Sequence, residues 1–253
     1  MRKRKIALVT GGSRGLGKDM AISLAKRNID VILTYHSKKE EAEAVVSEIN
    51  KLGATAVALQ LDTGNIQSFD SFFAQIKAEL KSKFDTESFD FLINNAGIGI
   101  TAPFAQTTEE QFDTLTNIHF KGVYFLTQKA LPLLNDGGRI INLSSGLARF
   151  TLPGFSVYAS LKGAIETLTK YLAKELGSRF ITVNAIAPGA IATDFGNASL
   201  KTNVQAQEYM KSVTAIPRVG QPEDIGGVVA FLCSDEAGWV NAQTIEVSGG
   251  MNI

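Results

Sequence analysis

Short apolar runs alternate along this chain with longer segments of mixed polarity. The short runs are rich in β-branched or otherwise apolar residues and show little polar alternation, which is typical of strands buried on both faces of a sheet. They predict strands at Lys5–Thr10, Asp30–Tyr35, Thr55–Leu61, Phe89–Asn94, Arg139–Leu143, Thr182–Ala187 and Thr244–Val247.

The segments between these runs have helical periodicity. Leu16, Met20 and Leu24 are four residues apart, and the stretch Lys38–Leu52 is charged on one side and apolar on the other. Repeated strand–helix units predict an α/β fold with a parallel sheet and helices on both faces. Right-handed crossovers would make it a doubly wound, Rossmann-type sheet of about seven strands.

The 253 residues contain no linker, repeat or low-complexity tract, so a single domain over residues 1–253 is expected. The least regular stretch is about 188–217, punctuated by Gly189, Gly196 and Pro217. A long irregular segment in a compact domain is usually functional. We therefore predict that 188–217 is a substrate lid.

Composition excludes several classes of function. The chain has 25 Lys and Arg against 25 Asp and Glu, and this balance predicts no nucleic-acid partner. No apolar stretch approaches the length of a membrane span, so no membrane partner is expected. Cys233 is the single cysteine and lies in the apolar run Val228–Cys233, which predicts a buried, inert thiol and a reducing, cytoplasmic location. We predict no metal site.

A glycine-rich turn, Thr10-Gly-Gly-Ser-Arg-Gly-Leu-Gly17, follows the first predicted strand and opens the first predicted helix. Glycines let the backbone approach a pyrophosphate closely, and a helix N-terminus offers free N–H groups. The turn therefore predicts a dinucleotide site, with contacts at Gly11, Ser13, Arg14, Gly15, Leu16 and Gly17.

The spacing of this turn resembles that of the short-chain dehydrogenases/reductases, which carry Thr-Gly-x-x-x-Gly-x-Gly at this place. Asn94-Asn-Ala-Gly97, at the end of the fourth predicted strand, matches the family's Asn-Asn-Ala-Gly motif. The resemblance continues to Ser248-Gly-Gly250 and covers essentially the whole chain. It implies an oxidoreductase with a single NAD(P)-binding domain.

The end of the second predicted strand favours NADP(H) over NAD(H). Enzymes that use NAD place an acid there to accept from the ribose 2′-OH, and we align Thr34 with that acid. A 2′-phosphate would instead meet cations and hydroxyls, because Arg14 lies in the turn and Tyr35, His36 and Ser37 follow.

The resemblance implies further cofactor contacts. Asp62 resembles the aspartate that contacts adenine, and the residues from Asn94 would wall the adenine-ribose side and brace the sheet. Near the sixth strand, the backbone at Ile191 and the hydroxyl of Thr193 would hold the nicotinamide carboxamide. The expected contacts are Asp62, Asn94, Ala96, Gly97, Tyr158, Lys162, Pro188, Gly189, Ile191 and Thr193.

Ser145, Tyr158 and Lys162 form the predicted catalytic group. If the chain is helical from Val157, Tyr158 and Lys162 share one face. The resemblance makes Tyr158 the general acid/base, Ser145 a hydrogen-bond donor to the substrate oxygen, and Lys162 a ligand of the nicotinamide ribose. We expect the Lys162 ammonium and an oxidised nicotinamide to lower the pKa of Tyr158. Strand alternation should turn Ser144 away from Ser145.

One position departs from the family pattern. Many members have an asparagine that helps hold a water of the proton relay, and His119 stands at that place in Thr116–Gly122. We expect His119 to position this water and to add a group that titrates near neutral pH.

Apolar side chains around the site, such as Phe150, Phe155 and Phe195, favour a small, uncharged, apolar or aromatic ketone or ketoester as substrate. A 3-oxoacyl-thioester reductase is the alternative, with Arg149 as a candidate contact for an acidic carrier. An enoyl reductase is disfavoured, because that branch spaces its tyrosine and lysine more widely. A dinucleotide sensor without turnover ranks lowest. The resemblance also implies a homotetramer, or a homodimer, through helices near Thr107 and Ser156 and the C-terminal strand.

Overall fold

The computed structural model describes residues 4–195 and 199–253. Within them, seven strands form one parallel sheet in the order β3-β2-β1-β4-β5-β6-β7. Their bounds are β1 (Ile6–Val9), β2 (Asp30–Tyr35), β3 (Ala56–Gln60), β4 (Phe89–Asn94), β5 (Leu134–Leu143), β6 (Thr182–Pro188) and β7 (Thr244–Val247). The predicted strands and the doubly wound Rossmann-type fold are confirmed.

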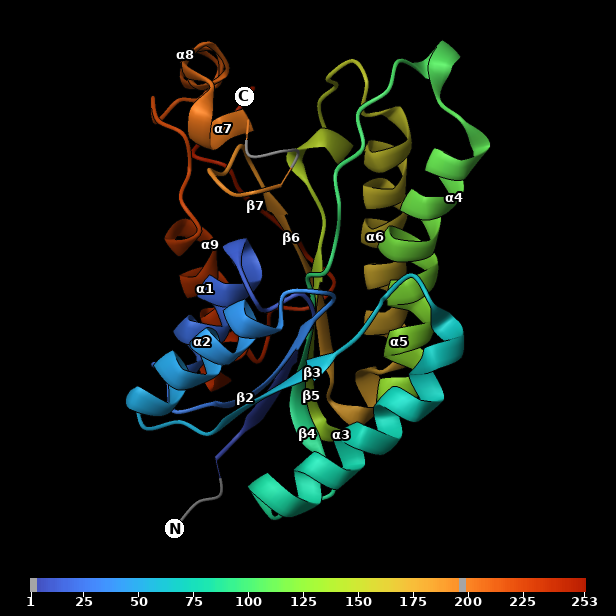
Figure 1. Cartoon of the computed structure of the whole chain (residues 1–253), viewed down its shortest axis with the longest axis vertical. Coiled ribbons are helices and arrows are strands. Elements are labelled where there is room, and N and C mark those ends of the chain that lie inside the picture. Colours follow the sequence, from blue (N-terminus) through green and yellow to red (C-terminus); the bar gives the residue numbers. More distant parts are fainter. Residues whose placement is uncertain (1–3, 196–198) are drawn as a thin grey trace.

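Helices cover both faces of the sheet (Figure 1). One layer consists of α1 (Gly15–Ala25), α2 (Lys39–Lys51) and α9 (Glu223–Leu232). The other consists of α3 (Phe69–Phe84), α4 (Glu109–Thr116), α5 (Gly122–Ala130) and α6 (Ser156–Glu175). Each layer closes its own apolar cluster against the sheet, with Met20 and Leu24 buried in the first and Phe69 and Leu80 in the second.

Strand β5 begins five residues before its predicted start at Arg139. Phe89 pairs with Leu134, and the register then shifts so that Phe91 pairs with Arg139. The sequence between them is Asn-Asp-Gly-Gly, which is typical of a turn and was therefore excluded from the predicted strand. In the structure these residues form an irregularity inside the strand, with Gly137 at φ 74°.

The predicted lid, 188–217, is more regular than expected. It contains two short helices, α7 (Ser199–Thr202) and α8 (Val204–Ser212). The Asn203 side chain caps α8 by accepting from the backbone N–H of Ala206 at 3.0 Å. Gly196, which we expected to punctuate the segment, lies outside the described residues.

The sheet order reverses between β1 and β4, and in such sheets the ligand crevice lies beyond the carboxyl ends of the strands at this point. The glycine turn and the end of β4 both lie there. No helix among the described residues combines the length and apolar character needed to cross a membrane.

Candidate active site

The glycine turn leaves the N-terminus of α1 open. Arg14 occupies the cap position without a side-chain cap bond, and the first turn of α1 contains no acidic residue. Gly11 and Gly15 have positive φ values of 65° and 53°, and a Cβ at Gly17 would lie 2.2 Å from the Gly11 carbonyl oxygen. Only glycines allow this close backbone turn, and its free N–H groups fit a pyrophosphate.

Thr10 and Asn95 fasten the turn to the end of β4. The Thr10 hydroxyl accepts from the backbone N–H groups of Asn95 and Ala96 at 2.9 and 3.0 Å. The Asn95 amide donates to the carbonyls of Thr10 and Gly11 at 2.8 and 3.1 Å. The sequence reasoning missed this pair as site residues, although both belong to the motifs that identified the turn and the strand end.

Thr34 does not occupy the position that the alignment assigned to it. Its side chain is buried, and its hydroxyl accepts from the N–H of Gly11 at 3.1 Å. Tyr35 is the first partly exposed residue at this strand end, followed by exposed His36. The alignment was therefore wrong by at least one residue. No carboxylate replaces it, because Tyr35, His36 and Ser37 carry none.

Asp62 and His36 lie near each other beside this strand end, with 3.9 Å between Oδ2 and Nε2. The other Asp62 oxygen accepts from the N–H of Gly64 at 2.8 Å. Both side chains are more than half exposed, so both can reach a ligand in the crevice. Their predicted adenosine contacts stay predictions.

Asn94 is buried in a chain of polar side chains beneath the site. Its amide donates to Thr127 on α5 at 3.0 Å and to Asn142 on β5 at 2.8 Å. Asn142 in turn donates to Thr169 on α6 at 2.9 Å. This series of side-chain hydrogen bonds supports the predicted role of Asn94 in bracing the sheet. Its exposed fraction is 4%, which leaves little surface for the cofactor.

Strand β5 and helix α6 bring the catalytic group together. Tyr158 and Lys162 lie one turn apart on α6, and Lys162 Nζ is 5.5 Å from the centre of the Tyr158 ring. The hydroxyl of Ser145 bonds the Tyr158 side chain, whereas that of Ser144 donates to Glu166 at 2.6 Å. The different partners of the two serines agree with the expected alternation.

The pKa of Tyr158 moves opposite to the predicted direction. Burial raises it to about 12, although the hydrogen bond from Ser145 lowers it in part. The Lys162 ammonium donates to the carbonyl of Leu143 at 2.6 Å, and burial lowers the pKa of Lys162 to about 7. The contribution expected from an oxidised nicotinamide stays a prediction. In the protein itself Tyr158 is a protonated phenol at neutral pH, ready to donate.

His119 reaches the catalytic group through an unusual helix. Residues Asn117–Lys121 form a short π-helix, η3, between α4 and α5, and such single π-helical turns often mark functional sites. The His119 ring stands edge-on to Tyr158, with 5.1 Å between ring centres. Its Nε2 lies 2.8 Å from the carbonyl oxygen of Ile98 and 3.3 Å from the Ile98 nitrogen. The shorter contact assigns the proton to Nε2.

The expected titration of His119 near neutral pH is wrong. Burial, followed by the nearby Lys162 ammonium, lowers the pKa of His119 to about 3, so the ring is neutral in the working range. Its Nδ1 is buried and, among the described residues, has no hydrogen-bond partner. A neutral ring with Nδ1 as acceptor can still hold a water, so the positioning role stays open.

The predicted lid contacts both the glycine turn and Tyr158. Thr193 lies against the turn, because a Cβ at Gly15 would be 3.6 Å from its side chain. Asp194 pairs with Arg14 at 3.8 Å and with Lys201 at 2.7 Å. The ring centre of Phe195 lies 5.7 Å from that of Tyr158. Ile191 bridges to Gly220, which places its backbone at the entry to the lid.

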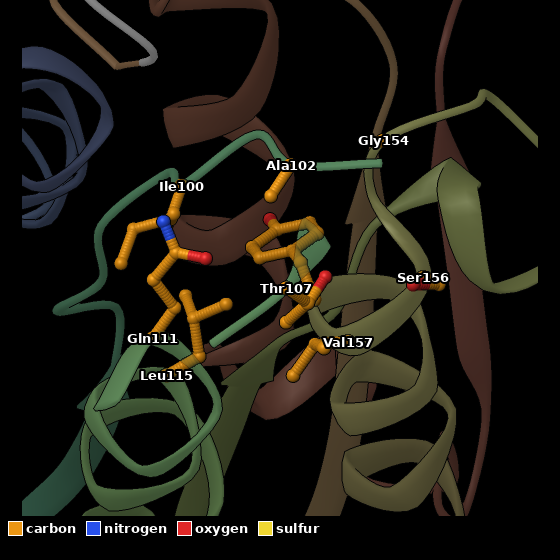
Figure 2. Close-up of a pocket in the computed structure, with 9 residues that line it drawn as sticks. Ile100, Ala102, Thr107, Gln111, Leu115, Gly154, Ser156 and Val157 are labelled. Atoms are coloured by element: carbon orange, nitrogen blue, oxygen red, sulfur yellow. The ribbon is translucent and has the colours of Figure 1, made fainter. Parts of the chain in front are cut away.

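A small hollow of about 10 Å³, room for about one water, lies beside Tyr158 (Figure 2). Figure 2 shows Ile100 and Ala102 from the segment after β4, Gln111 and Leu115 from α4, and Val157 from α6 converging on it. Its walls are mostly apolar, which fits an uncharged substrate group. The arrangement can donate a proton from Tyr158 to a carbonyl oxygen and stabilise that oxygen through Ser145.

Comparison with known proteins agrees with this geometry. The family model described as "Enoyl-(Acyl carrier protein) reductase" matches residues 11–252. A protein of Pestalotiopsis microspora named short-chain dehydrogenase/reductase GME11373 is 40% identical, over 97% of this chain and 94% of its own. The chain belongs to the short-chain dehydrogenase/reductase family. It is an oxidoreductase of that family, as the sequence predicted.

Relatives within the family have different printed activities. The 3-oxoacyl-[acyl-carrier-protein] reductase FabG of Staphylococcus aureus is 42% identical over 99% of both chains. The solved structure of the angucycline C-6 ketoreductase LanV with bound NADP has a TM-score of 0.93 at 35% identity, over 98% of this chain and 95% of LanV. Family membership therefore leaves the substrate to be argued from the site.

Proposed function

We propose that this chain is an NADPH-dependent ketoreductase that reduces an uncharged, apolar or aromatic ketone or ketoester to a secondary alcohol. The observation that carries the proposal is the buried Tyr158 hydroxyl, bonded to Ser145 and flanked by aromatic rings. NADPH supplies the hydride, and the protein binds and orients both reactants. Ser145 bonds the ketone oxygen, and Tyr158 gives that oxygen its proton.

The choice of NADPH rests on charge at the adenosine end of the crevice. No carboxylate ends β2, and Arg14, whose ion pair with Asp194 is long at 3.8 Å, offers a guanidinium beside the turn that fits the pyrophosphate. LanV was solved with NADP bound, and so was a short-chain dehydrogenase from Burkholderia cenocepacia that is 35% identical over all of this chain. Lys162 holds the ribose of the nicotinamide in this proposal.

The aromatic rings around Tyr158 favour a ketone with an apolar body. Phe155 and Phe195 lie 6.4 and 5.7 Å from it between ring centres. Two relatives act on fused-ring compounds by their names, the angucycline ketoreductase and a hydroxynaphthalene reductase-like protein of Metarhizium brunneum, which is 37% identical. Both names support an aromatic ketone as the substrate.

Reduction of a 3-oxoacyl carrier thioester is the second candidate, and the FabG relatives favour it. An acidic carrier needs free cations at the mouth of the site. Arg149, the candidate named from the sequence, is paired with Glu246, and the two lysines of the predicted lid are paired as well, Lys201 with Asp194 and Lys211 with Glu208. This pairing ranks the carrier substrate lower. The four-residue spacing of Tyr158 and Lys162 continues to disfavour an enoyl substrate.

We also propose that His119 holds a relay water through Nδ1, in place of the family asparagine. Assembly as a homotetramer, or a homodimer, is supported by large apolar side chains exposed on the expected surfaces. They are Phe104, Phe112 and Tyr124 near α4 and α5, Tyr171 on α6, and Trp239 before β7. Sedimentation analysis tests the assembly, and cell fractionation tests the predicted cytoplasmic location.

The deciding experiment follows the loss of NADPH absorbance with a panel of aryl ketones, ketoesters and a 3-oxoacyl thioester. We expect turnover with the aryl ketones and a higher kcat/KM with NADPH than with NADH. Turnover confined to the thioester would favour the second candidate. Tight NADPH binding with no turnover of any substrate would instead point to a dinucleotide sensor.

A further inference from the structure

Arg149 lies four residues after Ser145, in the loop that leaves β5. Its guanidinium donates to both carboxylate oxygens of Glu246 on β7, at 2.7 Å from Nε and 2.8 Å from Nη2. It also donates to the backbone carbonyls of Met251 at 2.7 Å and Asn252 at 3.0 Å. The Arg149 side chain therefore joins the loop that contains Ser145 to β7 and to the segment after β7. We name this segment, residues 249–252, the tail.

The tail is bonded to the far end of the lid. Three backbone hydrogen bonds make this connection: Ala215 N–H to Gly250 O at 3.1 Å, Ile216 N–H to Gly249 O at 2.9 Å, and Asn252 N–H to Val213 O at 2.8 Å. Met251 is buried between these bonds and Arg149. Arg149 is thus connected to the lid through two successive sets of hydrogen bonds, one from Arg149 to the tail and one between the tail and residues 213–216.

The Arg149–Glu246 pair contributes more to orientation than to stability. The Arg149 side chain is 45% exposed, and ion pairs so open to water stabilise a fold weakly. A planar guanidinium with a carboxylate and two carbonyls as acceptors nevertheless defines one geometry, which a lysine ammonium cannot reproduce. Ser248 also donates to Glu246 at 2.7 Å and further orients that carboxylate.

Arg179 offers a matched comparison at the opposite end of the sheet. It pairs with Asp136 at 2.7 Å and donates to the carbonyls of Leu131 and Leu134. Its contacts therefore have the same chemistry as those of Arg149. It differs in location, because β5 and its partner strands separate it from the crevice.

We propose that Arg149 is a positioning residue that fixes the lid relative to Ser145 through the tail, and so sets the affinity for the ketone. This inference rests on the proposed reductase function. The lid carries Phe195 against Tyr158, so a displaced lid loses substrate contacts. The adenosine end of the crevice is formed by other segments, whereas the expected nicotinamide contacts Ile191 and Thr193 belong to the start of the lid, so cofactor affinity should fall less than ketone affinity.

The experiment compares Arg149→Ala, Arg149→Lys and the control Arg179→Ala in the full chain. We measure KM for the ketone, KM for NADPH, kcat, the melting temperature, and amide hydrogen exchange at 213–216. For Arg149→Ala we expect KM for the ketone to rise about tenfold, KM for NADPH to rise by a smaller factor, and exchange at 213–216 to accelerate. Arg149→Lys should fall between Arg149→Ala and the wild type.

The control Arg179→Ala should lower the melting temperature and leave KM for the ketone and exchange at 213–216 unchanged. A KM for the ketone that moves no more in Arg149→Ala than in Arg179→Ala would overturn the inference. If the wild type reduces no ketone, the proposed function fails and exchange alone decides. Faster exchange at 213–216 in Arg149→Ala but not in Arg179→Ala would then support the coupling, and equal exchange would refute it.

Discussion

The predicted catalytic group and the predicted lid meet where Phe195 contacts Tyr158, but different interactions hold them. Tyr158, Lys162 and His119 are buried, and packing together with short bonds to backbone carbonyls orients their side chains. The lid is held by half-exposed ion pairs, such as those of Asp194 with Arg14 and Lys201. Burial shifts the pKa values of the first region strongly and provides its chemistry. Weak surface pairs leave the second region free to adapt.

Removing the phenol of Tyr158 should have the largest effect. Tyr158→Phe keeps the ring contacts with His119 and Phe195 but cannot donate a proton, so we expect kcat to fall about a thousandfold. NADPH binding, measured by fluorescence, should stay unchanged. A kcat within tenfold of the wild type would mean that another group supplies the proton.

Acid stability tests the buried neutral state of His119. The pKa of His119 is lowered from 6.5 to about 3, so between these values the unfolded chain binds a proton that the folded chain does not. Stability should therefore fall as the pH drops, by about 2 kcal/mol between pH 7 and pH 5 from this residue. His119→Gln should remove that loss, as measured by urea unfolding at both pH values.

His36 provides the control for this experiment, because it is exposed and the chain has only two histidines. His36→Gln should keep the acid loss of the wild type. Equal acid sensitivity of the wild type and His119→Gln would show that the His119 ring is not held neutral by burial.

Phe195 is the point where the two regions touch. Phe195→Ala removes an aromatic wall from the site, and we expect KM for an aryl ketone to rise about fivefold with kcat little changed. A small aliphatic ketone should lose less. Phe180→Ala, at an exposed position outside the lid, is the matched control. An equal KM change in both variants would show that Phe195 makes no specific contribution to substrate binding.

The ion pairs of the lid should produce the smallest effect. Lys201→Ala removes one partner of Asp194, whose pKa is lowered first by its hydrogen bond with Lys201. Because the carboxylate is exposed, we expect the free energy of unfolding to change by less than about 0.5 kcal/mol. Denaturation in low and high salt measures this change. A loss of 2 kcal/mol or more would show that the lid is held as firmly as the catalytic group.

Much of the fold and the site could be predicted because the signals are local. Buried strands are continuous apolar runs, and the glycine turn and the pair Tyr158 and Lys162 are recognisable by spacing. The prediction of strand β5 was too short because Asn135–Gly138 has the composition of a turn and contacts made elsewhere in the chain place it in the sheet.

The remaining differences depend on tertiary environment. Spacing showed that Lys162 is near Tyr158, but only the fold shows that burial raises the pKa of Tyr158, partly offset by the hydrogen bond with Ser145. The same reason explains the low pKa of His119. Arg149 looked like a free cation in the sequence because its partner, Glu246, lies 97 residues away.

The π-helix at Asn117–Lys121 affects what a single-residue deletion would do to the protein. A π-helical turn contains one more residue than an α-helical turn, so it is the form that a single-residue insertion takes when the rest of the helix keeps its place. Deleting one residue there would restore regular α-helix and remove the bulge that places His119 beside Tyr158, while α5 keeps its orientation relative to α4. Gly122 already passes so close to Thr63 that a Cβ would lie 2.1 Å from its carbonyl oxygen. We expect a single-residue deletion at 117–121 to act on the protein through the lost position of His119 rather than through a displaced α5.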